Sequence, residues 1–76
     1  MPFDAPLTRR EKRLLRRLAE EKSDAEIALR IGGTAKQIAV QRERLLARLG
    51  IISHSQIREA ATSLARWPYH QNKFTR

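Results

Sequence analysis

The chain has 76 residues, which is enough for one small domain but leaves no room for a sensory domain beside it and little room for a deep enzyme pocket. It contains no cysteine, which excludes disulfides and thiolate metal sites and fits a reducing compartment. Sixteen Lys and Arg against eight Asp and Glu give a net charge of +8, which indicates a polyanionic partner. Nucleic acid fits better than a membrane surface, because no segment pairs a basic face with bulky aromatic side chains. A basic surface that is merely solvated is the alternative.

No segment resembles a targeting or membrane-spanning sequence. The longest apolar runs have two or three residues, and the N-terminus lacks the pattern of a secretory signal, so the cytoplasm is the expected location. Two prolines discourage a helix in residues 1–6, which we expect to form a flexible arm. Residues 68–76 show no periodicity and are expected to form a flexible tail. The folded domain is therefore predicted to cover residues 7–67.

The first helix is expected to begin after Thr8, which stands three residues before Glu11 in the spacing of a capping box. Leu14, Leu15 and Leu18 share the face that is suited to burial. The outer face is basic, and five of its side chains are candidate contacts to DNA phosphates: Arg9, Arg10, Lys12, Arg13 and Arg16. For any one of them, the alternative is a side chain that only keeps a small protein soluble.

A short second helix is expected over about residues 24–31, where Ser23 and Glu26 repeat the capping-box spacing. Leu29 points away from the apolar face, so we expect it to make a peripheral contact or to be exposed. The segment 32–34, Gly-Gly-Thr, leads directly into the next helix. Two helices joined by a three-residue turn that contains Gly are the sequence form of a helix-turn-helix.

The third helix is expected to run from Thr34, which pairs with Gln37 in another capping box, to Gly50, a typical left-handed stop. One face is apolar and carries Ile38, Leu45, Leu46 and Leu49. The opposite face carries small, polar and basic side chains: Lys36, Gln37, Ala39, Val40, Glu43, Arg44 and Ala47. A helix with one face to bury and a basic face to present is interpreted as the reading helix of a DNA-binding domain.

A fourth helix is expected from a cap at Ser53, with Gln56 in capping-box spacing and Ser55 as an alternative cap, to the neighbourhood of Trp67, where Pro68 stops it. One such pair is common by chance. Four pairs, each at the start of an apolar-periodic segment, predict an all-α fold, and no stretch alternates with the period of a strand. The predicted architecture is a four-helix, tetrahelical helix-turn-helix domain.

Several of these signals occur together in one known family. They are Leu7-Thr8, Arg10-Glu11, Leu15, Leu18-Ala19, Ser23, Glu26-Ile27-Ala28, Gly32, Thr34, Lys36, Ile38, Leu46, Leu49-Gly50 and Ser53. The combination resembles the DNA-binding domain of LuxR/FixJ-type (GerE-like) bacterial regulators over about residues 7–66. Region 4 of sigma factors is a related but weaker match. The LuxR-type resemblance implies four helices, with the third in the major groove of DNA and the fourth often mediating dimerisation.

The chain departs from the pattern of that family at several positions. Glu21-Lys22 replaces the usual Gly-Leu, and a left-handed backbone at Glu21 costs roughly 1–2 kcal/mol. Gly33 stands where an apolar residue usually packs under the turn, so a core contact is expected to be lost. Arg42 stands where a branched aliphatic residue is common, and its stem is expected to lie along the apolar surface.

The resemblance implies that bases are read from the positions of Ala39, Val40 and Glu43, where the family frequently has lysine at the first and third. Ala39 cannot donate a hydrogen bond, whereas Val40 suits a thymine methyl group and Glu43 suits cytosine N4. Arg44 suits a bidentate contact to guanine or phosphate, with a free surface arginine as the alternative. The start of the helix suits a phosphate. The candidate DNA-binding residues are Thr34, Lys36, Gln37, Val40, Glu43, Arg44 and Arg48.

The predicted function is sequence-specific, LuxR-type transcription regulation, with helix 34–49 in the major groove of double-stranded DNA. The alternative is a protein-interaction module that modulates another regulator without reading DNA, which the side chains of Ala39 and Glu43 favour and the charge disfavours. A homodimer is a further option if Trp67, Tyr69 and Phe74 supply its contact.

An enzyme is not expected, because the chain has no carboxylate pair, phosphate loop or metal-ligand spacing. His54 and His70 lie far apart in the sequence, and His54 is expected to be a surface residue at a helix start. No cofactor, metal or small-molecule site is predicted.

Overall fold

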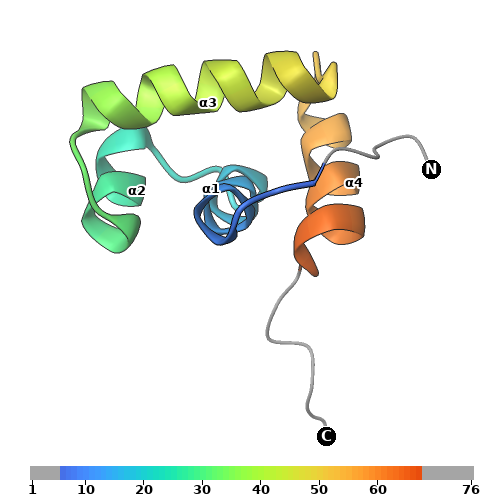
Figure 1. Cartoon of the computed structure of the whole chain (residues 1–76), viewed down its shortest axis with the longest axis horizontal. Coiled ribbons are helices and arrows are strands. Elements are labelled where there is room, and N and C mark those ends of the chain that lie inside the picture. The colour runs from blue at the N-terminus through green and yellow to red at the C-terminus, as the bar shows by residue number, and fades with distance from the viewer. Residues whose placement is uncertain (1–5, 68–76) are drawn as a thin grey trace, which may run out of the picture.

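Within residues 6–67, which the computed structural model describes, the chain forms four α-helices and no strand. They are α1 (Arg9–Ala19), α2 (Asp24–Ile31), α3 (Ala35–Leu49) and α4 (His54–Ala65) (Figure 1). The predicted all-α, four-helix fold is confirmed. Most of the expected N-terminal arm and the whole of the expected tail, with Tyr69, His70 and Phe74, lie outside the described residues.

The first three helices begin with the capping boxes that the sequence predicts. In α1, the Thr8 hydroxyl accepts from the N–H of Glu11 at 3.0 Å, and the Glu11 carboxylate accepts from the N–H of Thr8 at 2.9 Å. The same reciprocal pair forms at the starts of α2 and α3. Each box supplies acceptors for N–H groups that have no partner inside the helix.

The start of α4 differs from the prediction. Ser53 is the cap, and its hydroxyl accepts from the N–H of Gln56 at 3.3 Å, whereas Ser55 lies inside the helix. The side chain of Gln56 accepts from the N–H of Ile52 at 2.7 Å and not from Ser53. The predicted hydrogen bond from the N–H of Ser53 to the Gln56 side chain is therefore wrong, because the N–H of Ile52 occupies that amide oxygen instead.

Two of the helix ends share one hydrogen-bonding pattern. At the end of α3, Gly50 has a φ of 70°, and the N–H of Ile51 donates to Leu46 O at 2.9 Å. At the end of α1, Glu21 has a φ of 61°, and the N–H of Lys22 donates to Arg17 O at 3.2 Å. Both are Schellman motifs, whose left-handed position favours glycine. The left-handed backbone whose cost was considered for Glu21 is thus present, on a residue that carries a side chain.

Helix α4 ends at Ala65, earlier than the neighbourhood of Trp67 where Pro68 was expected to stop it. Arg66 has a left-handed φ of 56°, and the N–H groups of Arg66 and Trp67 both donate to the carbonyl oxygen of Ala61. The helix is therefore closed by its own backbone before the proline is reached.

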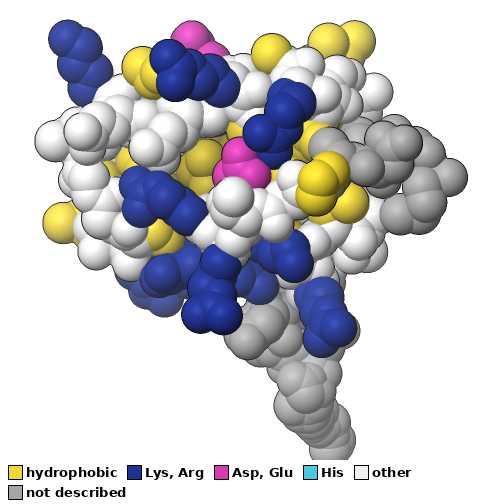
Figure 2. All heavy atoms as spheres, viewed as in Figure 1, with side chains coloured by type: hydrophobic (Ala, Val, Ile, Leu, Met, Phe, Trp, Pro, Cys, Tyr) yellow, Lys and Arg dark blue, Asp and Glu magenta, His cyan; other side chains and the backbone are white. Residues whose placement is uncertain are grey.

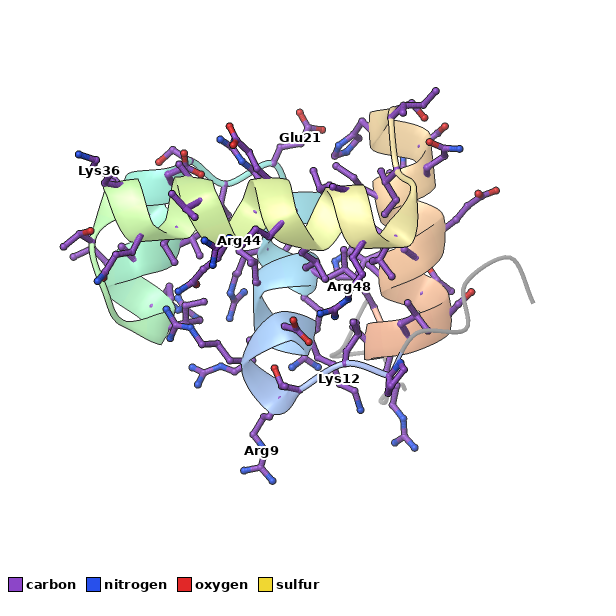
Figure 3. All side chains as sticks on the ribbon, turned by 45° about the horizontal axis from the view of Figure 1, so that its top comes forward. Arg9, Lys12, Glu21, Lys36, Arg44 and Arg48 are labelled. Carbon is purple, nitrogen blue, oxygen red and sulfur yellow. The ribbon has the colours of Figure 1, made fainter. Side chains whose placement is uncertain are left out.

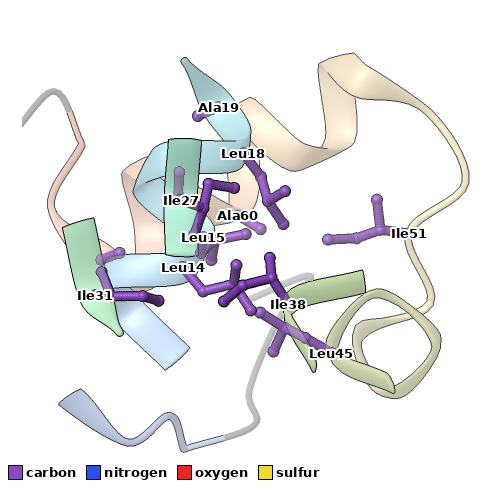
Figure 4. Packing of buried hydrophobic residues seen from close by; sticks show 12 residues of the cluster. Leu14, Leu15, Leu18, Ala19, Ile27, Ile31, Ile38, Leu45, Ile51 and Ala60 are labelled. Atoms are coloured by element: carbon purple, nitrogen blue, oxygen red, sulfur yellow. The ribbon is translucent and has the colours of Figure 1, made fainter. Parts of the chain in front are cut away.

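Helix α1 lies in the middle of the domain and packs against α4 on one side and α2 on the other, while α2 packs against α3 (Figure 1). The core between them is made from one face of each helix (Figure 4). The side chains of Leu15, Ile27 and Ile38 have no exposed surface, and that of Leu45 is 2% exposed. Leu29, in contrast, is 87% exposed, which is the second of the two outcomes expected for it. None of the described helices has the length and apolar character needed to cross a membrane.

Candidate nucleic-acid interface

The turn between α2 and α3 is built from two glycines. Gly32 and Gly33 have φ values of 93° and 98°, which residues with a side chain rarely adopt. Thr34 then caps α3, and its hydroxyl accepts from the N–H of Gln37 at 3.1 Å. The turn therefore fixes where α3 begins and leaves its first turn exposed to solvent.

The face of α3 that the sequence predicts to be presented is exposed, except for the half-buried Ala39. A shallow hollow beside its first half is lined by Thr34, Lys36, Gln37, Val40, Gln41 and Arg44. Lys36, Arg44 and Arg48 are spaced along the helix, and Arg9 and Lys12 project from α1 on one side of it (Figure 3). Lys and Arg side chains also gather around α1 and along α3 on the face that Figure 2 shows. The helix and its flank thus form one basic surface.

A second hollow lies between the start of α1 and the second half of α3. Its lining includes Arg10, Glu11, Gln41, Arg44 and Arg48. Gln41 and Arg44 line both hollows, so the two adjoin at these residues. Gln41 is absent from the predicted site, although it lies four residues after Gln37 and three before Arg44 and so shares a face of the helix with them.

Arg44 is a basic side chain of α3 that is open to a ligand, as Lys36 is. It is exposed, and no group within residues 6–67 forms a hydrogen bond or an ion pair with its guanidinium. Arg48, by comparison, pairs with the carboxylate of Glu11 at 3.0 Å. Arg44 and Arg48 were both predicted to bind DNA. The structure shows that they differ, because only Arg48 has an ion-pair partner within the described residues.

The ion pair with Arg48 also involves the cap of α1. The same Glu11 oxygen accepts from the N–H of Thr8, so one carboxylate serves both helices. The hydrogen bond from Arg48, followed by the one from the backbone of Thr8, lowers the pKa of Glu11 below its ordinary value of 4.5. The negative charge beside Arg48 is thus held firmly at neutral pH.

The positions from which the family often reads bases differ in exposure. Ala39 is half-buried, whereas Glu43 is exposed and Val40 is 41% exposed. Arg42 lies between them on the buried side, and its guanidinium pairs with Asp24 of α2 at 3.3 Å. Its half-buried stem agrees with the orientation expected for it.

The five basic side chains of α1 that were candidates for phosphate contact have different surroundings. Arg9 and Lys12 are exposed and extend into solvent (Figure 3). Arg13 donates to the carbonyl oxygen of Arg30 at 3.4 Å, and Arg16 donates to that of Ala65 at 3.1 Å. Arg10 uses all three nitrogens of its guanidinium within the fold. Among these five side chains, Arg9 and Lys12 are therefore the ones left accessible to a ligand.

Four helices, a tight turn before an exposed basic helix and a basic flank define a helix-turn-helix DNA-binding domain. Residues 5–61 match the family model GerE, described as bacterial regulatory proteins of the luxR family. The match covers most of the chain, and the chain belongs to this family. The domain that defines this family is a DNA-binding domain of transcription regulators. No curated protein sequence and no solved structure matches the chain.

Proposed function

We propose that the domain reads a specific sequence in double-stranded DNA by laying α3 in the major groove. The observation that carries the proposal is Arg44, an exposed and unengaged guanidinium in the middle of the presented face of α3. The major groove is wide enough to admit one helix, and an arginine at its centre can donate two hydrogen bonds to the edge of guanine. The exposed side chains of Val40 and Glu43 would then face neighbouring bases.

Five of the remaining candidate residues are assigned to the sugar-phosphate backbone: Thr34, Lys36, Arg48, Arg9 and Lys12. Thr34 and Lys36 lie at the start of α3, where free N–H groups and the helix dipole favour a phosphate. Arg48 lies at the other end of the helix, and Arg9 and Lys12 extend the basic surface beyond it. Contacts of this kind fix orientation on the duplex without specifying sequence.

The competing function is a module that binds another regulator. The exposed carboxylate of Glu43 on the presented face favours it, because phosphates repel a carboxylate. DNA reading is favoured over it by the basic residues of α3 that line the two hollows, Lys36, Arg44 and Arg48. The two functions predict different ligands for the same face of α3.

Selection from a randomised pool of DNA duplexes at physiological salt separates the two functions. We expect a short sequence to be enriched by the 76-residue chain, and an inverted repeat in that sequence would mean that two copies bind together. Failure to enrich any sequence, together with capture of a second regulator from cell extract, would replace the proposal by the interaction module.

A further inference from the structure

We infer that Arg10 is a positioning residue for DNA reading, which sets the direction of α3 without contacting DNA itself. The inference rests on the proposed function. It assigns Arg10 a role different from that of Arg9 and Lys12, which share its charge and its helix. Three hydrogen bonds, one glycine and the position of Gln41 support it.

The guanidinium of Arg10 connects three helices. From α1, it donates to the carbonyl oxygen of Ile31 at 2.6 Å and to that of Gly32 at 2.9 Å. Its third nitrogen donates to the side chain of Gln41 on α3 at 3.3 Å. Both carbonyl groups lie at the end of α2, where helix geometry leaves oxygens without donors and the helix dipole favours a positive charge. A planar guanidinium with donors in a fixed fork suits this arrangement.

Gly33 lies beside this guanidinium and beside the cap of α3. A Cβ at this position would lie 3.4 Å from Nη2 of Arg10 and 2.9 Å from the amide oxygen of Gln37. That amide oxygen is the acceptor of the capping box of α3. A side chain here would therefore crowd the cap and lie in contact with the fork. The expected loss of a core contact at Gly33 is accompanied by a polar connection beneath the turn.

Through its hydrogen bond with Gln41, Arg10 is connected to the surface that would face DNA. Gln41 lines both hollows of the candidate interface, one turn from Gln37 and beside Arg44. Arg10 thus holds the end of α2 and a residue of the presented face of α3 in one network. A rotation of α3 by a few degrees would displace Arg44 from the base that it contacts, whereas phosphate contacts through flexible side chains tolerate such a change.

The test compares R10K with R16K, since both variants keep the positive charge and remove a guanidinium fork. Arg16 donates to the end of α4, as Arg10 does to the end of α2, so R16K is a matched control away from the turn. The measured quantity is the ratio of affinities for the duplex enriched by selection and for a duplex of unrelated sequence. We expect R10K to lower this ratio by about tenfold, the effect of roughly one mismatched base pair, and R16K to leave it unchanged.

The slope of affinity against salt distinguishes positioning from a phosphate contact. A positioning role predicts that R10K and R10A lower the ratio together while the salt slope of each stays that of the native chain. A phosphate contact predicts that R10K keeps the ratio and that R10A reduces the slope by about 0.9. The second result, or an equal fall of the ratio in R16K, would overturn the inference.

A measurement without DNA distinguishes failure of the inference from failure of the proposed function. Residual dipolar couplings give the orientation of α3 relative to α2, and we expect R10K, but not R16K, to change it. An unchanged orientation in R10K would refute the positioning role. If the native chain enriches no sequence while R10K reorients α3, the proposed function fails and the role of Arg10 in the turn stands.

Discussion

Arg44 has no internal role within residues 6–67, so its removal should affect binding far more than folding. We expect R44A to weaken binding of the selected duplex by about 1–3 kcal/mol and to relax the preference for one base pair, as loss of a bidentate contact does. K22A is the control, because it removes an exposed positive charge from the loop between α1 and α2. Competition binding to duplexes that differ at one position measures both variants. Equal losses in R44A and K22A would reduce Arg44 to a general electrostatic contribution.

Glu11 links a helix cap to a candidate DNA contact, and E11Q separates the two roles. Gln37 shows that a glutamine closes a capping box in this chain, so E11Q should retain the cap while losing the ion pair with Arg48. Glu26 caps α2 in the same way without an arginine partner within residues 6–67, which makes E26Q the matched control. We expect E11Q to bind DNA about two- to fivefold more tightly, because Arg48 no longer shares its charge with a carboxylate. A similar gain in E26Q would show that only net charge matters.

The pH dependence of stability supplies a second measurement on E11Q. The pKa of Glu11 is lowered in the folded state, mainly by the hydrogen bond from Arg48, so the folded protein binds fewer protons than the unfolded chain near the ordinary value of 4.5. This stabilisation is present above pH 4.5 and is lost as pH falls through the lowered pKa. Urea denaturation from neutral pH down to acid should therefore show a shallower loss of stability in E11Q than in the native chain.

Residue by residue, the sequence predicts contacts that are local. The caps at Thr8, Ser23 and Thr34 join residues three positions apart, so the spacing alone identifies them. The acceptors of Arg10 lie 21, 22 and 31 positions away. No local pattern predicts them, and Arg10 therefore resembles its basic neighbours until the fold brings α2 and α3 beside it.

At the level of helices and turns, the two Schellman motifs offer a direct comparison. Gly50 occupies the left-handed position after α3, and Glu21 occupies the same position after α1. We expect E21G to stabilise the domain by about 1 kcal/mol, because glycine adopts this conformation without steric cost. The contact between Glu21 and His54, at 3.5 Å between exposed groups, contributes little and does not offset the gain.

K22G is the control for E21G, since the neighbouring residue has no positive φ. There the added backbone freedom of the unfolded chain should lower stability slightly. Thermal or urea unfolding of both variants measures the difference. If E21G is less stable than the native chain, Glu21 must make a contact that outweighs its backbone strain.

The extents of the helices follow from the sequence to different degrees. The starts of α1, α2 and α3 are predicted well because capping residues mark them, and glycines mark the ends of α2 and α3. The end of α4 is predicted less well, because an arginine gives no sequence signal for the left-handed conformation that Arg66 adopts. Pro68 is the visible signal, but the helix closes on the carbonyl oxygen of Ala61 before it.

For the molecule as a whole, the charge of +8 predicts how DNA binding responds to salt. Each phosphate that is neutralised contributes a slope of about −0.9 to the plot of log affinity against log salt. With Arg9, Lys12, Lys36 and Arg48 on the backbone, and Arg44 on a base, we expect a slope of about −4. Fluorescence anisotropy on an unrelated duplex across salt concentrations measures it. A flat response would argue against the assigned backbone contacts.

The packing of the helices against one another is harder to predict from the sequence than their number. Apolar spacing shows which face of α3 is buried, and Ile38 and Leu45 are indeed fully or almost fully enclosed. It does not show that α1 packs against α4 while α2 packs against α3, because the apolar faces are chemically alike. Which helices pack against each other is therefore known from the structure and was not predicted.

The bond from Arg16 to Ala65 joins residues that are 49 positions apart, so docking of α4 against α1 closes most of the chain into one loop. Closing a long loop costs configurational entropy that local helix formation does not repay, and α4 is therefore expected to dock late in folding. A ligand that binds only the closed form shifts this equilibrium by mass action. DNA bound to α3 would then stabilise the docked position of α4. A substitution that weakens the docking of α4 would in turn weaken DNA binding, although it alters no contact between protein and DNA.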